Sequence, residues 1–224
     1  ISSHIFGLLS PEIDNGRSAA MIEGNETASH AGLAIVGMSC RFPGGVSSPG
    51  SFWEFIHAGS QSSAQIPFDR WDVSSLTARS NLSEKEKMQV SFGSFVHDME
   101  FLDHSVFRIS KAEAESMSPL QRVLLECSYL ALLDAGYTSD EMKGLNCGVF
   151  VGASAATGAH ERPTNSGSGR NERSVYSATG SSASIASGRI SYVFNFQGPN
   201  TVYDTACSSS LVAIDAAISA LQMG

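Results

Sequence analysis

The chain of 224 residues has the composition of a folded, acidic protein. Hydrophobic residues make up 42% of it and charged residues 16%, whereas disordered chains are less apolar and more highly charged. Its 14 Lys and Arg against 22 Asp and Glu give a net charge of −8 with no basic cluster, so nucleic acids and anionic membranes are excluded as expected partners. No apolar run approaches the roughly 18 residues of a membrane helix, and no membrane span is predicted.

The start of the chain and its cysteines indicate in which cellular compartment the protein is expected. The chain begins with Ile1, and no basic segment followed by an apolar run opens it, so we expect a piece of a longer protein without a visible signal peptide. Its cysteines are Cys40, Cys127, Cys147 and Cys207. They form no C-x-x-C pair and fit neither a metal site nor a disulfide framework. Reduced cysteines favour a cytoplasmic protein, with an organelle left open.

Charge is spread unevenly along the chain. From Gly144 onward there are eight charged residues, four of each sign, so the whole excess of −8 lies in residues 1–143. The nearly neutral last third is rich in Ala, Ser and Gly. A chain seldom exposes such a stretch entirely, and we expect it to be buried in a core or a subunit interface.

The first half of the chain carries signals for one strand and one helix. Residues 1–31 show no sustained period and are assigned to a linker or disordered N-terminus. The apolar run at 33–36, closed by Gly37, predicts a buried strand. Ser48-Pro49 predicts the start of a helix that Gly59 ends.

Helices and strands alternate in the second half. Ser110 and Glu113 have the spacing of a capping box, and Ser118-Pro119 begins a longer helix that ends at Gly136. The remaining expected elements are a strand at 147–151, a loop at 153–173, a small-residue helix at 174–188, a strand at 201–203, and a helix after Ser208 whose apolar face is Leu211, Ile214, Ile218 and Leu221. This alternation predicts an α/β fold with a mainly parallel sheet.

Cys207 is the candidate for chemistry, because the pattern places it between the last strand and the last helix. Free amides and the helix dipole at that end favour a thiolate, and backbone N–H groups there would face an oxyanion. Small neighbours, Ala206 and Ser208, leave room for a bulky acyl group. The alternative is a buried structural cysteine, which is the commoner role.

The run Gly198-Pro-Asn-Thr-Val-Tyr-Asp-Thr-Ala-Cys-Ser-Ser-Ser-Leu-Val-Ala213 resembles the active-site motif of β-ketoacyl synthases, the ketosynthase domains of polyketide and fatty acid synthases. Further stretches that resemble the family are Ala34-Ile-Val-Gly-Met-Ser-Cys-Arg-Phe-Pro-Gly44, Pro67-Phe-Asp-Arg-Trp-Asp72, residues 107–126 and Ser187-Gly-Arg-Ile-Ser-Tyr192. The resemblance covers about residues 32–224. It implies Cys207 as the nucleophile that carries the acyl thioester, with its own backbone amide toward the oxyanion. The intact Asp-Thr-Ala-Cys-Ser-Ser-Ser run looks more like a polyketide synthase or another large multienzyme.

The resemblance implies a thiolase-like layered α/β/α/β/α fold built from two similar halves, usually as a homodimer. Residues 32–224 would be the N-terminal half of such a ketosynthase domain. The implied reaction is a decarboxylative condensation of an acyl chain on Cys207 with a malonyl-type extender. Both substrates would be thioesters carried on the phosphopantetheine of an acyl carrier protein, with no metal or other cofactor bound.

Two other functions remain open at this stage. The family's two catalytic histidines lie in motifs after the nucleophile, whereas His4, His30, His57, His97, His104 and His160 all precede Cys207 and lie in no such motif. The chain alone is therefore expected to be inactive. A non-elongating domain of the same fold, which only binds carrier protein or transfers acyl chains, is one alternative. A cysteine hydrolase with a Cys–His pair is the other.

Five positions depart from the family's usual residues. They are Lys111 for Pro, Ser118 for Asp, Leu120 for Gln, Tyr129 for Trp and Asp215 for His. All lie outside the immediate run around Cys207, so we expect their effects on packing or on the surface.

Overall fold

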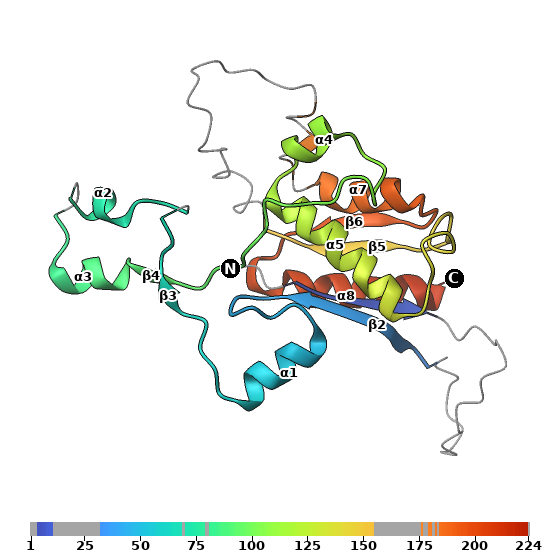
Figure 1. Cartoon of the computed structure of the whole chain (residues 1–224). Helices are drawn as coiled ribbons and strands as arrows, with labels where there is room; N and C mark the ends of the chain where they lie inside the picture. The colour runs from blue at the N-terminus through green and yellow to red at the C-terminus, as the bar shows by residue number, and fades with distance from the viewer. Residues whose placement is uncertain are drawn as a thin grey trace. The chain divides into compact units, whose positions relative to one another are not determined.

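The computed structural model describes residues 4–10, 32–68, 70–78, 81–154, 176, 179–180, 182 and 184–223 (Figure 1). The chain forms two compact units, one mainly of residues 40–99 and the other of residues 6–39 and 100–224. The strands are β1 (His4–Ser10), β2 (Ala34–Arg41), β3 (Ala64–Gln65), β4 (Phe92–Gly93), β5 (Val149–Gly152) and β6 (Asn200–Tyr203). The described helices are α1 (Pro49–His57), α2 (Val73–Ala78), α3 (Glu84–Gln89), α4 (Lys111–Ser116), α5 (Pro119–Asp134), α7 (Ile185–Phe194), the 3-10 helix η2 (Ala206–Ser208) and α8 (Ser209–Met223). The predicted α/β class is confirmed.

Strand pairing follows the expectation in the second unit. Strands β5 and β6 are parallel, with Val149 opposite Asn200 and Gly152 opposite Tyr203. Strand β1 pairs with β2, and the short β3 and β4 are antiparallel. The sequence did not predict β1, which lies within residues 1–31. Residues 11–31 lie outside the described residues, as does the loop expected at 153–173 apart from its first two residues, so the linker remains a prediction.

Helix starts follow the predicted capping chemistry. Ser48 and Ser118 are the N-caps of α1 and α5, and each hydroxyl accepts the backbone N–H three residues on. Ser110 caps α4 in the same way, but its predicted capping box is only half formed. The Glu113 carboxylate instead pairs with the buried guanidinium of Arg189. A buried charge needs an opposite charge beside it more than the exposed backbone amide at the helix start needs a cap.

Two helices differ from the prediction. The helix that overlaps the one expected at 174–188 is α7, which begins at Ile185 and ends at Phe194, and its C-cap Asn195 has a φ of 53°. Its large apolar residues, Ile190 and Phe194, lie beyond the predicted end, and their burial extends the helix. The last helix begins with the 3-10 turn η2 before α8, so its start at about Ser208 was nearly right.

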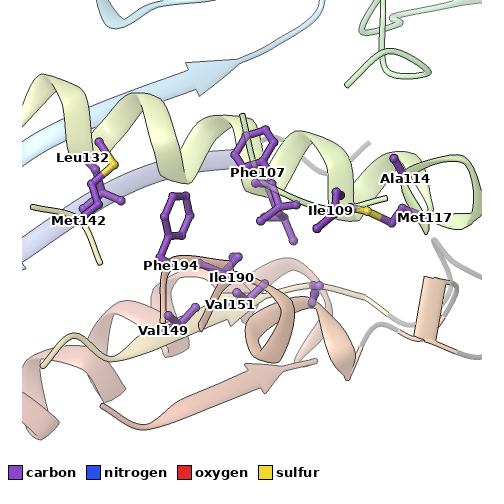
Figure 2. Close-up of a cluster of buried hydrophobic side chains, with 14 residues drawn as sticks. Phe107, Ile109, Ala114, Met117, Leu132, Met142, Val149, Val151, Ile190 and Phe194 are labelled. Carbon is purple, nitrogen blue, oxygen red and sulfur yellow. The ribbon is translucent and has the colours of Figure 1, made fainter. Parts of the chain in front are cut away.

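The buried core of the second unit lies between helix α5 and the elements around strand β5 (Figure 2). Leu124, Leu125 and Leu132 of α5 are at most 2% exposed. They pack in one cluster with Val151 of β5 and Phe194 of α7. A smaller cluster of Cys40, Phe42 and Val46 lies in the first unit.

The apolar face predicted for α8 is not the face that packs in this chain. Its buried residues are Ser209 and Ala213, whereas Leu211 is 72% and Ile214 49% exposed. Helix α8 contacts β5, and in Figure 1 it lies below the β5–β6 pair while α7 lies above. The residues of α8 that face β5 are small, because the helix lies too close to the Gly152 end of the strand for larger side chains to fit.

The segment Ala206–Met223 also corrects the expectation that no apolar run reaches the length of a membrane helix. Among the described residues this one segment, with a mean hydropathy of 1.3, is long and apolar enough to cross a membrane by length and composition. A single segment of this kind is weak evidence for a span, because the core helix of a folded domain passes the same test.

The position of Leu125 yields a test of the core. Leu125→Ala should lower the free energy of unfolding by about 2–5 kcal/mol, because the side chain is fully buried and its loss leaves a cavity. Leu130→Ala on the same helix, where the side chain is 46% exposed, should cost under about 1 kcal/mol. Denaturant unfolding of both variants checks this, and equal costs would contradict the packing described.

Candidate active site

Cys207 lies in the short 3-10 helix that joins strand β6 to helix α8. Strand β6 ends at Tyr203, η2 spans Ala206–Ser208, and α8 begins at Ser209. The predicted strand-to-helix position is therefore confirmed. The thiol is exposed, which answers the alternative of a buried structural cysteine.

The backbone of this turn is strained just before the cysteine. Ala206 has φ of 54°, a left-handed conformation that costs a residue with a side chain roughly 1–2 kcal/mol. Local polar groups hold the turn: the Ala206 N–H donates to the Asp204 carboxylate at 3.4 Å, and the Ser208 hydroxyl donates to Thr205 O at 2.9 Å. Strain of this kind persists only where surrounding contacts fix it, and it is frequent at active sites.

Strand β5 fixes the start of helix α8. A Cβ added at Gly152 would lie 2.6 Å from the carbonyl carbon of Ser209 and 2.6 Å from the N of Ser210. Real Cβ atoms do not approach other atoms so closely, so only glycine allows the helix to start against the strand. The Ala153 N–H also donates to Tyr203 O at 2.9 Å, which ties the ends of β5 and β6 together.

The same turn presents backbone amides near the thiol. Cys207 is the second residue of η2, so its N–H has no acceptor inside that helix. An N–H at a helix start is a donor available to a ligand oxygen, and the dipole of α8 adds partial positive charge there. The arrangement can therefore bind a negatively charged oxygen beside an exposed sulfur.

The other cysteines are in different surroundings. Cys40 and Cys127 are buried, and burial raises the pKa of the Cys40 thiol. Cys147 is half-buried, its Sγ lies 3.5 Å from Gly148 O, and burial raises its pKa to about 11. Burial keeps the Cys40 and Cys147 thiols protonated at neutral pH, and all three cysteines are at least partly shielded, so Cys207 differs from them in its access to solvent.

His104, the one histidine that the structure describes in the second unit, is not paired with Cys207. The Nδ1 of His104 lies 3.1 Å from Ile109 O, and the His57 ring lies against Trp53 at 6.1 Å. His30 and His160 lie outside the described residues. A Cys–His pair of the hydrolase type is therefore absent from the described residues of the second unit. Nor does the described part of the chain contain a group of three or more His, Cys, Asp or Glu that could hold a metal ion.

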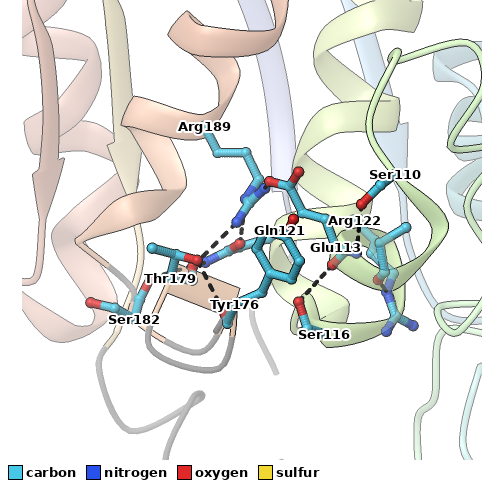
Figure 3. A network of polar contacts seen from close by, with 10 residues as sticks. Ser110, Glu113, Ser116, Gln121, Arg122, Tyr176, Thr179, Ser182 and Arg189 are labelled. Atoms are coloured by element: carbon cyan, nitrogen blue, oxygen red, sulfur yellow. Dashed lines mark hydrogen bonds and ion pairs between the residues drawn. The ribbon is translucent and has the colours of Figure 1, made fainter. Parts of the chain in front are cut away.

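A buried polar network joins helix α7, which leads into β6, to helices α4 and α5 (Figure 3). The side chain of Arg189 on α7 is 5% exposed and pairs with Glu113 of α4 at 2.5 Å. Its Nε donates to Gln121 Oε1 at 2.7 Å, and the Gln121 amide donates to Thr179 O and Ser182 O at 3.0 Å. The sequence analysis missed this network, although Arg189 is the one charged residue between Ser174 and Tyr203.

Comparisons with known proteins identify the family of the chain. The model of the β-ketoacyl synthase N-terminal domain matches residues 31–224. The chain belongs to the β-ketoacyl synthase family. It is 38% identical to the polyketide synthase GfsB of Streptomyces halstedii, over 100% of this chain and 4% of that protein. It is 39% identical to the phenolphthiocerol synthesis polyketide synthase type I Pks15/1 of Mycobacterium bovis, over 99% of this chain and 10% of that one.

A solved ketosynthase has the same fold. The ketosynthase from module 6 of the bacillaene synthase of Bacillus subtilis 168 superposes with a TM-score of 0.66 at 34% identity, over 84% of this chain and 29% of that chain. The expected thiolase-like fold and the ketosynthase resemblance are confirmed. The chain spans less than a third of the length of each of these relatives.

The five departures from the family's residues lie on the surface or in packing positions. Lys111 pairs with Glu115 at 3.8 Å on the surface, and Asp215 is exposed on α8. Ser118 caps α5, and Leu120 packs on the core. The Tyr129 hydroxyl lies 3.0 Å from Ser139 Oγ. None is within the turn that carries Cys207, as the sequence predicted.

Gly152→Ala tests the close contact between β5 and α8. The added Cβ should force the two elements apart, lower the free energy of unfolding by about 1–3 kcal/mol, and slow alkylation of Cys207 by iodoacetamide. Gly50→Ala is the matched control, because its Cβ would meet only Ser48 Oγ at 3.9 Å. If Gly152→Ala were as stable as the wild type and its Cys207 were alkylated at the same rate, strand β5 would not fix the start of helix α8.

The raised pKa of Cys147 predicts a pH dependence of stability. The unfolded chain should release the thiol proton near 9.0 and the folded chain near 11, so the stabilisation is complete below pH 9 and is lost as the pH rises toward 11. Cys147→Ala should flatten the fall in unfolding free energy over this window by at most about 1.4 kcal/mol per pH unit. Ser191→Ala is the control, because the side chain that it removes does not titrate. If the unfolding free energy of Cys147→Ala fell with pH as steeply as that of the wild type, the assignment would be contradicted.

Proposed function

We propose that the protein is a condensing acyltransferase of polyketide synthesis in which Cys207 is the nucleophile. The observation that carries the proposal is the exposed thiol at the start of α8, in a chain that belongs to the β-ketoacyl synthase family. Covalent catalysis divides a difficult transfer into two easier ones, and a thiolate is the nucleophile suited to thioesters. Fatty acid synthesis uses the same chemistry and is the less supported product class, because the curated relatives are polyketide synthases.

The first step transfers an acyl chain to the cysteine. The Cys207 sulfur attacks the carbonyl carbon of an acyl thioester on the phosphopantetheine of an acyl carrier protein. A new C–S bond forms, the carrier's C–S bond breaks, and the carrier thiol leaves with the proton that Cys207 gives up. During the attack the carbonyl oxygen becomes negative, and the Cys207 N–H is the donor that we expect to bind it.

The second step forms the carbon–carbon bond. A malonyl-type extender on the carrier protein loses CO2, and the electron pair left behind attacks the acyl carbon on Cys207. The bond to sulfur breaks, Cys207 is regenerated as a thiolate, and a β-ketoacyl thioester remains on the carrier. The energy for the step comes from the thioester and the lost CO2, so we propose that no bound metal or nicotinamide takes part.

The partners follow from the same chemistry. We propose acyl carrier protein, acyl thioesters and malonyl-type thioesters as partners. A homodimer is the proposed assembly, and the cytoplasm is the proposed location. Stabilisation of the enolate needs donors beyond Cys207, and no histidine of this sequence lies in a motif that could supply them. We therefore propose that residues 1–224 alone do not condense.

Substitution of the nucleophile tests the proposal. Cys207→Ala in the full-length protein should abolish acylation and lower condensation by roughly 10³-fold or more, because no alternative nucleophile remains. Cys127→Ala, which removes a buried thiol, should keep the activity. Incubation with a radiolabelled acyl thioester and peptide mapping locate the label. Label on Cys40, Cys127 or Cys147 with Cys207 clean would refute the assignment.

A further inference from the structure

Ser209 makes two hydrogen bonds that close the turn around Cys207. Its hydroxyl accepts the Thr205 N–H at 2.9 Å and donates to Ala206 O at 2.8 Å. The bonds span the residues immediately before the cysteine, one of which holds the left-handed φ of 54°. Ser209 is 5% exposed, so water does not replace these bonds easily.

Strand β5 holds Ser209 from the other side. Its carbonyl carbon and oxygen lie 2.6 and 2.7 Å from the position that a Cβ on Gly152 would take. The serine therefore lies between the strand and the turn, with its backbone against one and its hydroxyl bonded to the other. A residue fixed in this way can transmit the position of the sheet to the cysteine.

The two serines beside Ser209 do not share this arrangement. Ser208 is exposed, and its hydroxyl donates to Thr205 O and Thr205 Oγ1. Ser210 is also exposed. Of the three serines in the run after Cys207, Ser209 alone is buried.

We propose that Ser209 is a positioning residue for Cys207. By fixing the Thr205–Ala206 backbone, its hydroxyl holds the sulfur in front of the helix amides in the geometry needed for acyl transfer. Without the hydroxyl, Ala206 is free to leave its strained conformation and carry Cys207 with it. The proposal rests on the proposed function, since it concerns the nucleophile of that reaction.

The test compares Ser209→Ala, Ser209→Thr and Ser191→Ala in the full-length protein. Threonine keeps a hydroxyl that can bond to the backbone of the preceding turn. Ser191 is the matched control, because it is 8% exposed and its hydroxyl has no hydrogen-bond partner in the described part of the chain. Circular dichroism and the melting temperature set a working temperature at which every variant is folded.

Ser209→Ala should lower the rate of acylation and kcat by about 10- to 100-fold, with KM within about twofold of the wild type. Alkylation of Cys207 by iodoacetamide, which needs no catalysis, should slow as well. Ser209→Thr should recover most of the rate, and Ser191→Ala should match the wild type.

The proposal would be overturned if Ser209→Ala were acylated and alkylated at the wild-type rates, or if only its KM changed. It would also be overturned if Ser209→Thr lost as much activity as Ser209→Ala. Failure of the proposed function is a different result. In that case Cys207→Ala keeps its condensing activity, whatever Ser209→Ala does to the alkylation of Cys207.

Discussion

Helix α8 starts against strand β5 so closely that position 152 has no room for a side chain. This contact sets where the helix amides point, because the first turn of α8 cannot slide along the strand without a clash. It also explains which face of α8 is buried: Ser209 and Ala213 are small enough to lie against the strand. The larger apolar residues of the helix, such as Leu211, then face away from β5 and are exposed in this chain.

The helices on the other side of the strand pair depend on a second constraint, the buried charge of Arg189. A guanidinium that is 5% exposed requires partners for its charge and its N–H groups, and Glu113 and Gln121 supply them. These partners belong to α4 and α5, so the charge ties three helices together. Helix α7 leads directly into β6, and β6 leads into the turn of Cys207, so the network supports the site without touching it.

Much of the site could be predicted from the sequence, since it depends on local patterns. A strand signal at 201–203 and a helix signal after Ser208 are enough to place Cys207 at a strand-to-helix turn, and Ser-Pro pairs marked two helix starts correctly. The role of Glu113 could not be predicted from local patterns. Its spacing from Ser110 predicts a capping box, but its partner is an arginine 76 residues away, which local spacing cannot reveal. The buried face of α8 was missed for the same reason, because periodicity shows that faces exist and not which neighbour covers them.

A crystal structure of the full-length protein after reaction with an acyl thioester would test the central claim most directly. The account predicts continuous density from Cys207 Sγ to the acyl carbon, with the carbonyl oxygen about 3 Å from the Cys207 N–H. It also predicts that Ala206 keeps its left-handed backbone and that Ser209 keeps both hydrogen bonds. Acyl density on another residue, or a carbonyl oxygen turned away from that amide, would contradict it.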